Sequence, residues 1–229
     1  MGPTGWWVAD WWRVSPVIVI AWITWTIVSI VLHELAHGWA AIRCGDRTPI
    51  ELGRMTWNPL VHMGPMSLLV FALTGLAWGL MPVSPSRFRG RYDRAWVALA
   101  GPAMNLGLAA VALSAGVLWI AIGGGYWFTG FSAPDPLHAN TIAFLRTGAV
   151  LNVALAVFNL MPVPPLDGST VVGAFIPGYR EWLASEQGRI VVILGIVGLF
   201  YFGADFFFAF ASRAVDAATV SMRAILHAS

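Results

Sequence analysis

Residues 14–42 read VSPVIVIAWITWTIVSIVLHELAHGWAAI, an apolar run that ends with two histidines around a glutamate. Residues 14–32 carry no charged side chain, and helical continuation to residue 42 gives more than the roughly 20 residues that cross a bilayer. A helix suits a lipid environment because it satisfies its backbone hydrogen bonds internally. We therefore expect residues 14–42 to form a membrane-spanning helix.

The composition of the whole chain also points to lipid. Of its 229 residues, 58% are hydrophobic and 10% are Asp, Glu, Lys or Arg, whereas soluble domains average about 25% charged residues. This composition excludes a soluble globule and a disordered chain. The formal net charge of +2, without a long basic run, argues against a nucleic-acid partner. The single cysteine, Cys44, excludes an internal disulfide and a cysteine-rich zinc site.

Four more apolar runs follow the first. Residues 95–122, 140–161 and 190–212 are each long enough to span a bilayer. Residues 64–86 are interrupted by glycines and prolines, which suits a re-entrant segment or a short β element better than a regular span. The sequence therefore predicts one domain over residues 1–229, an all-α polytopic membrane protein. It would have about four to six transmembrane helices, with 64–86 as a re-entrant or short β element or an additional span.

The segment His33-Glu34-Leu35-Ala36-His37 has the spacing H-E-x-x-H. Residues four positions apart share a helix face, so both imidazoles can reach one metal ion. A carboxylate at Glu34 would lie beside the open position of that ion, where it can act as a general base. Three ionisable groups within a membrane helix are costly unless they have a function. We therefore expect His33 and His37 to be metal ligands and Glu34 to be catalytic.

The third metal ligand must come from elsewhere, because catalytic zinc takes three protein ligands and keeps one position for water. Asp167 is the strongest candidate, since it follows an apolar helix in the segment NLMPVPPLDG (159–168). The prolines exclude a regular helix there, and Gly168 permits a turn or a close backbone approach. Asp205 lies inside the last apolar run, where it could pair with a backbone donor or mark an interface.

Three motifs in this order resemble the site-2 proteases, a family of intramembrane zinc metalloproteases: HELAHG (33–38), AGPAMN (100–105) and NLMPVPPLDG (159–168). Further similarity runs through residues 54–62 and 81–89, so the resemblance covers roughly residues 16–170. Met63-Gly64-Pro65 departs from an I-D-P of many relatives at a position that is not a zinc ligand in the family. The resemblance is to a compact form without PDZ or CBS domains.

The resemblance implies that His33, His37 and Asp167 bind one Zn²⁺ per chain and that Glu34 is the general base. Asn159 matches a family position for binding the substrate backbone or the developing oxyanion. The implied function is zinc-dependent endopeptidase cleavage in or near transmembrane segments of single-span or signal-peptide-like substrates (regulated intramembrane proteolysis). An unwound substrate could add as a strand to an exposed edge, for which residues 47–55 and the re-entrant run are candidates.

The metal hypothesis constrains the topology, because His37 and Asp167 must lie on the same side of the membrane. Spans 95–122 and 140–161 supply two crossings, so residues 64–86 must enter and return rather than cross. Arginines flank that run on both sides, which places both ends in the cytoplasm under the positive-inside rule: Arg43, Arg47, Arg54, Arg87, Arg89, Arg91 and Arg94. We expect a multi-pass protein of the cell membrane with its zinc site towards the cytoplasmic side.

Other functions compatible with these motifs are a catalytically silent pseudoprotease that binds clients, a metal-permeation protein, and a protease acting on soluble peptides at the membrane face. Intact Glu34 disfavours the first, and ligands gathered at one end of the membrane disfavour the second. Among the other polar residues, His62 is expected to make a structural hydrogen bond and Asn152 an interhelical one. We expect His138 and His227 to be solvated.

Overall fold

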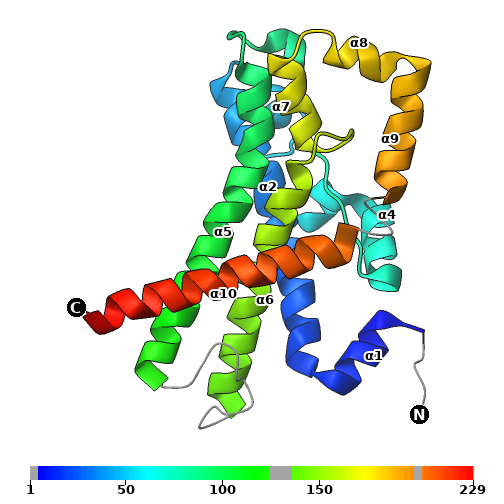
Figure 1. Cartoon of the computed structure of the whole chain (residues 1–229). Helices are drawn as coiled ribbons and strands as arrows, with labels where there is room; N and C mark the ends of the chain where they lie inside the picture. The colour runs from blue at the N-terminus through cyan, green and yellow to red at the C-terminus, as the bar shows by residue number, and fades with distance from the viewer. Residues whose placement is uncertain (1–4, 124–135, 199–202, 229) are drawn as a thin grey trace.

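The computed structural model describes residues 5–123, 136–198 and 203–228. Within these ranges the chain is helical and contains no β-strand (Figure 1). The expected short β element is therefore not found in this part of the chain. The elements in chain order are α1 (Trp7–Val14), α2 (Pro16–Arg43), α3 (Thr48–Glu51), α4 (Pro59–Thr74), the 3₁₀ helix η1 (Pro85–Arg87), α5 (Asp93–Gly123), α6 (Pro136–Asn159), α7 (Asp167–Phe175), α8 (Tyr179–Ala184), α9 (Glu186–Gly198) and α10 (Ala204–Ala228).

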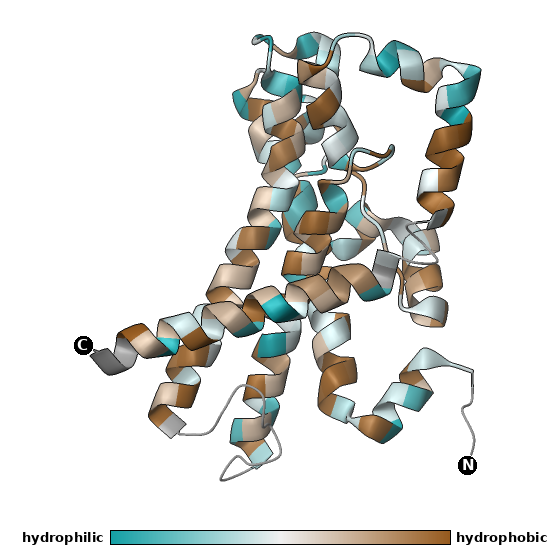
Figure 2. Ribbon diagram, viewed as in Figure 1, coloured by the Kyte–Doolittle hydropathy of each residue, from teal (hydrophilic) through white to brown (hydrophobic). Residues whose placement is uncertain are grey.

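Three helices, α2, α5 and α6, are long and apolar enough to cross a bilayer. Each packs against the other two, and apolar residues run along all three (Figure 2). Outward-facing side chains on α5 are apolar too: Val111 is 66% exposed and Ile122 is 83% exposed. Such a surface fits lipid better than water, and these helices confirm an all-α, multi-pass membrane protein.

The apolar run 64–86 folds back on itself. Helix α4 ends at Thr74. Gly75 follows with a φ of 79°, which glycine readily adopts, and the chain then returns along α4 without regular secondary structure. The Trp78 amide donates to the Ser67 hydroxyl (2.9 Å), and the Leu80 amide donates to the His62 carbonyl (3.0 Å). We call α4 together with residues 75–84 the α4 hairpin.

Both ends of the α4 hairpin lie near the C-terminal end of α2. The Ser84 amide donates to the carboxylate of Asp46, just beyond α2 (2.6 Å), whereas the turn at Gly75 accepts a bond from the indole of Trp22 near the start of α2 (3.3 Å). The chain therefore leaves this end of the bundle and comes back to it. Residues 47–55, the other candidate edge, include the short helix α3, so the expectation of an extended edge there was wrong.

No single described helix covers the predicted span 190–212. Instead α9 ends at Gly198 and α10 begins at Ala204. Helix α10 runs across α5 and α6 (Figure 1), and its buried residues Phe207, Ala211 and Val215 recur every four positions. Arg146 of α6 pairs with Asp216 of α10 (3.0 Å). This packing and this ion pair hold α10 against the bundle, in place of a continuous span with α9.

Candidate metal centre

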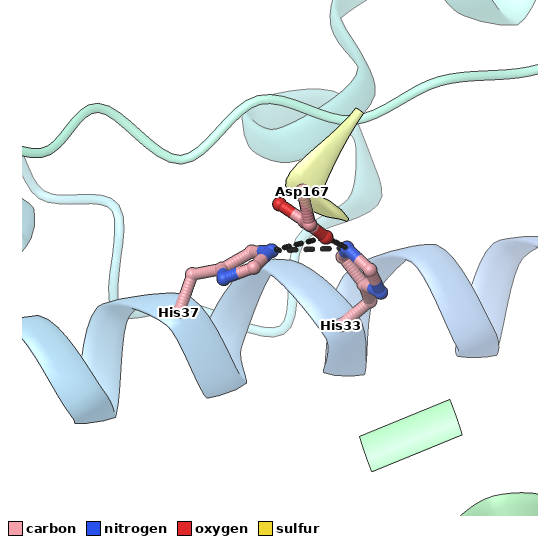
Figure 3. A group of neighbouring side chains, drawn as sticks. All are labelled: His33, His37 and Asp167. Atoms are coloured by element: carbon pink, nitrogen blue, oxygen red, sulfur yellow. Dashed lines mark hydrogen bonds and ion pairs between the residues drawn. The ribbon is translucent and has the colours of Figure 1, made fainter. Parts of the chain in front are cut away.

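Helix α2 presents two buried imidazoles from successive turns to one point. The Nε2 atoms of His33 and His37 are 3.0 Å apart. Asp167 approaches the same point, with its Oδ2 atom 3.2 Å from Nε2 of His33 and 3.4 Å from Nε2 of His37 (Figure 3). These three side chains are a group that could hold one metal ion. The predicted ligands come together, so Asp167 lies on the same side of the bundle as the histidine pair.

Asp167 reaches this point because the chain between α6 and α7 makes a compact turn. Helix α6 ends at Asn159, and α7 begins at Asp167 itself. The backbone of Gly168 packs directly against the carbonyl of Leu160, which leaves no room for a Cβ atom. The sequence expectation of a close backbone approach at Gly168 is therefore confirmed, and this contact places Asp167 above α2.

The outer nitrogens of both imidazoles have oxygen partners. Nδ1 of His37 is 2.7 Å from the carbonyl oxygen of Val97, and Nδ1 of His33 is 2.6 Å from Oδ1 of Asn105. A carbonyl oxygen can only accept, so His37 carries its proton on Nδ1 and turns the lone pair of Nε2 inward. His33 has the same arrangement when Oδ1 of Asn105 accepts the hydrogen bond from its Nδ1.

The donor set fits a divalent cation. A carboxyl group has an ordinary pKa of about 3.9, so Asp167 supplies an anionic oxygen at neutral pH. With both imidazoles in the tautomer set by their outer partners, this oxygen and two nitrogen lone pairs converge on one point, an arrangement that a divalent cation stabilises. Two imidazoles and one carboxylate are ligands of catalytic zinc, and they leave a fourth position open.

Glu34 lies beside this group. Its side chain is buried, and it lines the same cavity as His33, His37 and Asp167. The returning segment of the α4 hairpin covers it closely: a Cβ atom on Gly79 would lie 2.5 Å from Oε1 of Glu34. Glycine at position 79 therefore allows the backbone to pass directly over the carboxylate.

The cavity around these residues has a volume of about 730 Å³, in the range of ligand-binding pockets. Its walls come from α2, the hairpin segment 77–83, the start of α5, the end of α6 and residues 165–170. Asn159 lines it, although its amide nitrogen donates to the carbonyl of Leu155 in its own helix (3.0 Å). Its predicted role in substrate binding stays a prediction.

The roles of Gly101 and Asn105 in shaping this centre were not predicted from the sequence. A Cβ atom on Gly101 would lie 2.5 Å from Nε2 of both histidines, so glycine lets α5 approach the metal centre. Asn105 contacts His33 directly, and Asn152 bonds to Asn105. The AGPAMN motif contained Gly101 and Asn105 without indicating these contacts. Asn residues within apolar runs were the available signal, because buried amides need partners.

The remaining polar predictions have mixed outcomes. His62 makes the expected structural bond, with Nε2 2.6 Å from the carbonyl of Thr56, and Asn152 makes the expected interhelical one. The expectation for His138 was wrong: it is buried and its ring stacks on Trp119. Asp205 is exposed on α10 and does not line the cavity. The side chain of His227 lies outside the described residues.

Comparison with known proteins gives one consistent group of relatives. The family model "Peptidase family M50" matches residues 21–202. The chain is 33% identical to "Putative zinc metalloprotease YwhC" of Bacillus subtilis (strain 168), over 73% of this chain and 76% of that protein. It is 32% identical to "Putative zinc metalloprotease Rip2" of Mycolicibacterium smegmatis (strain ATCC 700084 / mc(2)155), over 75% of this chain and 64% of that protein. No solved structure gives a significant match.

Proposed function

The chain belongs to peptidase family M50 and is therefore a zinc metalloendopeptidase, and on this premise we propose that it cleaves peptide bonds in or near transmembrane segments of other membrane proteins. The observation that carries the proposal is the convergence of His33, His37 and Asp167 within a bundle of apolar helices. A site placed there is accessible to membrane-embedded chains. The expected substrates are single-span or signal-peptide-like proteins.

Zinc held by His33, His37 and Asp167 would supply a Lewis acid that activates water and polarises the scissile carbonyl. Glu34 would accept the proton of the attacking water and return it to the leaving amine, as a general base and then an acid. Its burial next to the donor group, under the backbone of Gly79, supports this role. Asn159, at the cavity wall, is the proposed group for the substrate backbone or the developing oxyanion.

A helical substrate must unwind before cleavage, because its carbonyls are occupied by hydrogen bonds within the helix. The returning segment of the α4 hairpin is the proposed edge for the unwound chain. The amides of Trp78 and Leu80 bond to α4, and successive peptide groups of an extended chain point to opposite sides. The amides of Gly79 and Met81 would then face the cavity and pair with substrate, as in strand addition.

The orientation in the cell membrane is part of the same proposal. The nearer histidine of the metal centre, His37, lies less than two turns before Arg43 at the end of α2, and Arg94 is in the first turn of α5. Further arginines follow in the segments next to these ends, among them Arg47, Arg54 and Arg87. Positive charge concentrates on the cytoplasmic side of membrane proteins, which supports a zinc site towards the cytoplasm.

The test is cleavage of a model single-span protein by the purified chain in proteoliposomes. We expect Glu34→Gln to lower the cleavage rate about 10²–10⁴-fold while zinc content stays the same, and a zinc chelator to abolish cleavage. Glu186→Gln, at an exposed position of α9, is the matched control and should cleave like the unchanged chain. Unchanged cleavage by Glu34→Gln, or in the chelator, would refute the mechanism. Zinc binding without any cleavage would favour a client-binding pseudoprotease.

A further inference from the structure

A buried chain of hydrogen bonds connects three helices behind the metal centre. Asn105 of α5 and Asn152 of α6 are both 0% exposed. Oδ1 of Asn105 is 2.6 Å from Nδ1 of His33, and Nδ2 of Asn105 donates to Oδ1 of Asn152 (2.9 Å). Nδ2 of Asn152 in turn donates to the backbone carbonyl of Gly148 (2.9 Å). The chain of bonds therefore runs from α6 through α5 to α2.

The far end of this chain fixes its direction. The Gly148 carbonyl has no proton to give, so the amide nitrogen of Asn152 must face it and the amide oxygen must face Asn105. Asn105 then has to turn its own nitrogen towards Asn152 and its oxygen towards His33. That oxygen can only accept, so His33 must be protonated on Nδ1. The lone pair on Nε2 is thereby directed at the point where Asp167 and His37 meet.

We infer that Asn105 and Asn152 are positioning residues that hold His33 in its metal-binding tautomer. His37 gets the same restraint from a main-chain carbonyl, that of Val97, which side-chain substitution does not remove. The restraint on His33 depends instead on two side chains from two other helices. The inference rests on the proposed metal centre but not on proteolysis, so its test measures metal binding alone.

The competing explanation is that the two amides only connect helices in an apolar environment. Leucine has the branched shape of asparagine, although it is larger, and offers no acceptor, whereas aspartate keeps an acceptor oxygen in the same position. A packing role therefore predicts that Asn105→Leu is tolerated better than Asn105→Asp, since the latter buries a charge. A positioning role predicts the opposite order of metal affinity, because only Asn105→Asp still accepts the Nδ1 proton.

The experiment titrates the detergent-purified full-length chain with Zn²⁺ against a competing chelator and records the absorption spectrum of the Co²⁺-substituted protein. We expect Asn105→Leu to lower zinc affinity about 10–100-fold. Asn105→Asp should lose less than about tenfold, because it keeps the acceptor for His33 although it can no longer donate to Asn152. Asn152→Leu should lie between Asn105→Leu and the unchanged chain, because Asn105 remains but is no longer oriented. The cobalt spectrum should change for both leucine variants.

Thr219→Val is the matched control. Thr219 is 1% exposed and bonds to the carbonyl of Val215 in its own helix, so its loss should change neither zinc affinity nor the cobalt spectrum. Helix content and elution volume identify any variant that fails to fold. If Asn105→Leu fails to fold, the zinc affinities of Asn152→Leu and Asn105→Asp test the inference. Equal affinity of Asn105→Leu and the unchanged chain, or equal loss in both Asn105 variants, would overturn the inference. If the variants show the expected order of zinc affinities but the unchanged chain does not cleave the model substrate, the inference stands and the proposed function is contradicted.

Discussion

The α4 hairpin and α9 are both apolar segments outside the three long helices, but they are held in different ways. The hairpin has polar anchors along its length: Asp46 at Ser84, Ser67 at Trp78 and Trp22 at Gly75. Helix α9 packs mainly on α8, and its side chains at Ile193 and Leu194 are 61% and 64% exposed. The α4 hairpin, which covers Glu34, is thus held by hydrogen bonds, whereas α9, which does not line the cavity, presents exposed apolar side chains.

The largest expected effect is a steric one on the kcat/KM for cleavage. Gly79→Val should lower the kcat/KM for the model substrate at least about a hundredfold, because displacing a catalytic group by about 1 Å is enough for such a loss. The added side chain would collide with Glu34, as the 2.5 Å approach of a Cβ atom indicates. Gly198→Val on α9, where nothing lies within 4 Å of a Cβ atom, should be neutral. If both variants cleave alike, the hairpin does not control the position of Glu34.

The next difference concerns anchoring. Asp46 is 0% exposed and accepts bonds from the Thr48 hydroxyl (2.5 Å), the Thr48 amide (3.0 Å) and the Ser84 amide (2.6 Å). Asp46→Ala should lower the free energy of unfolding by about 2–3 kcal/mol, because it leaves buried donors without an acceptor. Thermal unfolding in detergent measures this. Glu186→Ala on α9 should have no effect, and equal midpoints for the two variants would contradict the anchoring role.

The smallest effect is a pH dependence of the same anchor. Burial raises the pKa of Asp46, but hydrogen bonds from Thr48 and Ser84 outweigh it and hold the pKa below the ordinary 3.8. The ionised carboxylate therefore stabilises the fold above about pH 4, and this contribution is lost as the pH falls through the lowered pKa. The difference in unfolding free energy between the unchanged chain and Asp46→Asn should shrink from pH 5 towards pH 2. A constant difference would exclude Asp46 as its source.

The grouping of His33, His37 and Asp167 could be predicted from sequence because its constraints are local or few. The i, i+4 spacing of His33 and His37 fixes their common face, and the need for an even number of crossings brought Asp167 to the same end. The folded-back course of residues 64–86 followed from that requirement. The positions of these residues therefore follow from their spacing in the sequence or from the number of membrane crossings.

The rest depended on which helix faces meet. Asn105 and Asn152 are far apart in sequence, and no local pattern shows that their amides lie side by side behind His33. The run 190–212 has the length of a span, but the packing face of Phe207 and Ala211 and the pair between Arg146 and Asp216 decide its course. The returning segment of the hairpin is held by a side-chain bond and single backbone bonds instead of a β ladder. A pattern of apolar residues alone does not distinguish such a segment from a β-strand.

The returning segment of the α4 hairpin runs along most of the length of α2. It is bonded to Trp22 of α2 at its beginning and to Asp46 beyond α2 at its end, and the helix between these residues is roughly 30 Å long at 1.5 Å per residue. The steps from Gly75 to Ser84 reach about 30 Å when extended, which is enough to cover that length. The indoles of Trp6 and Trp7 bond to the Ala72 carbonyl near the turn of the same hairpin. The tryptophan-rich N-terminal end and the segment over Glu34 are therefore joined through one short piece of chain.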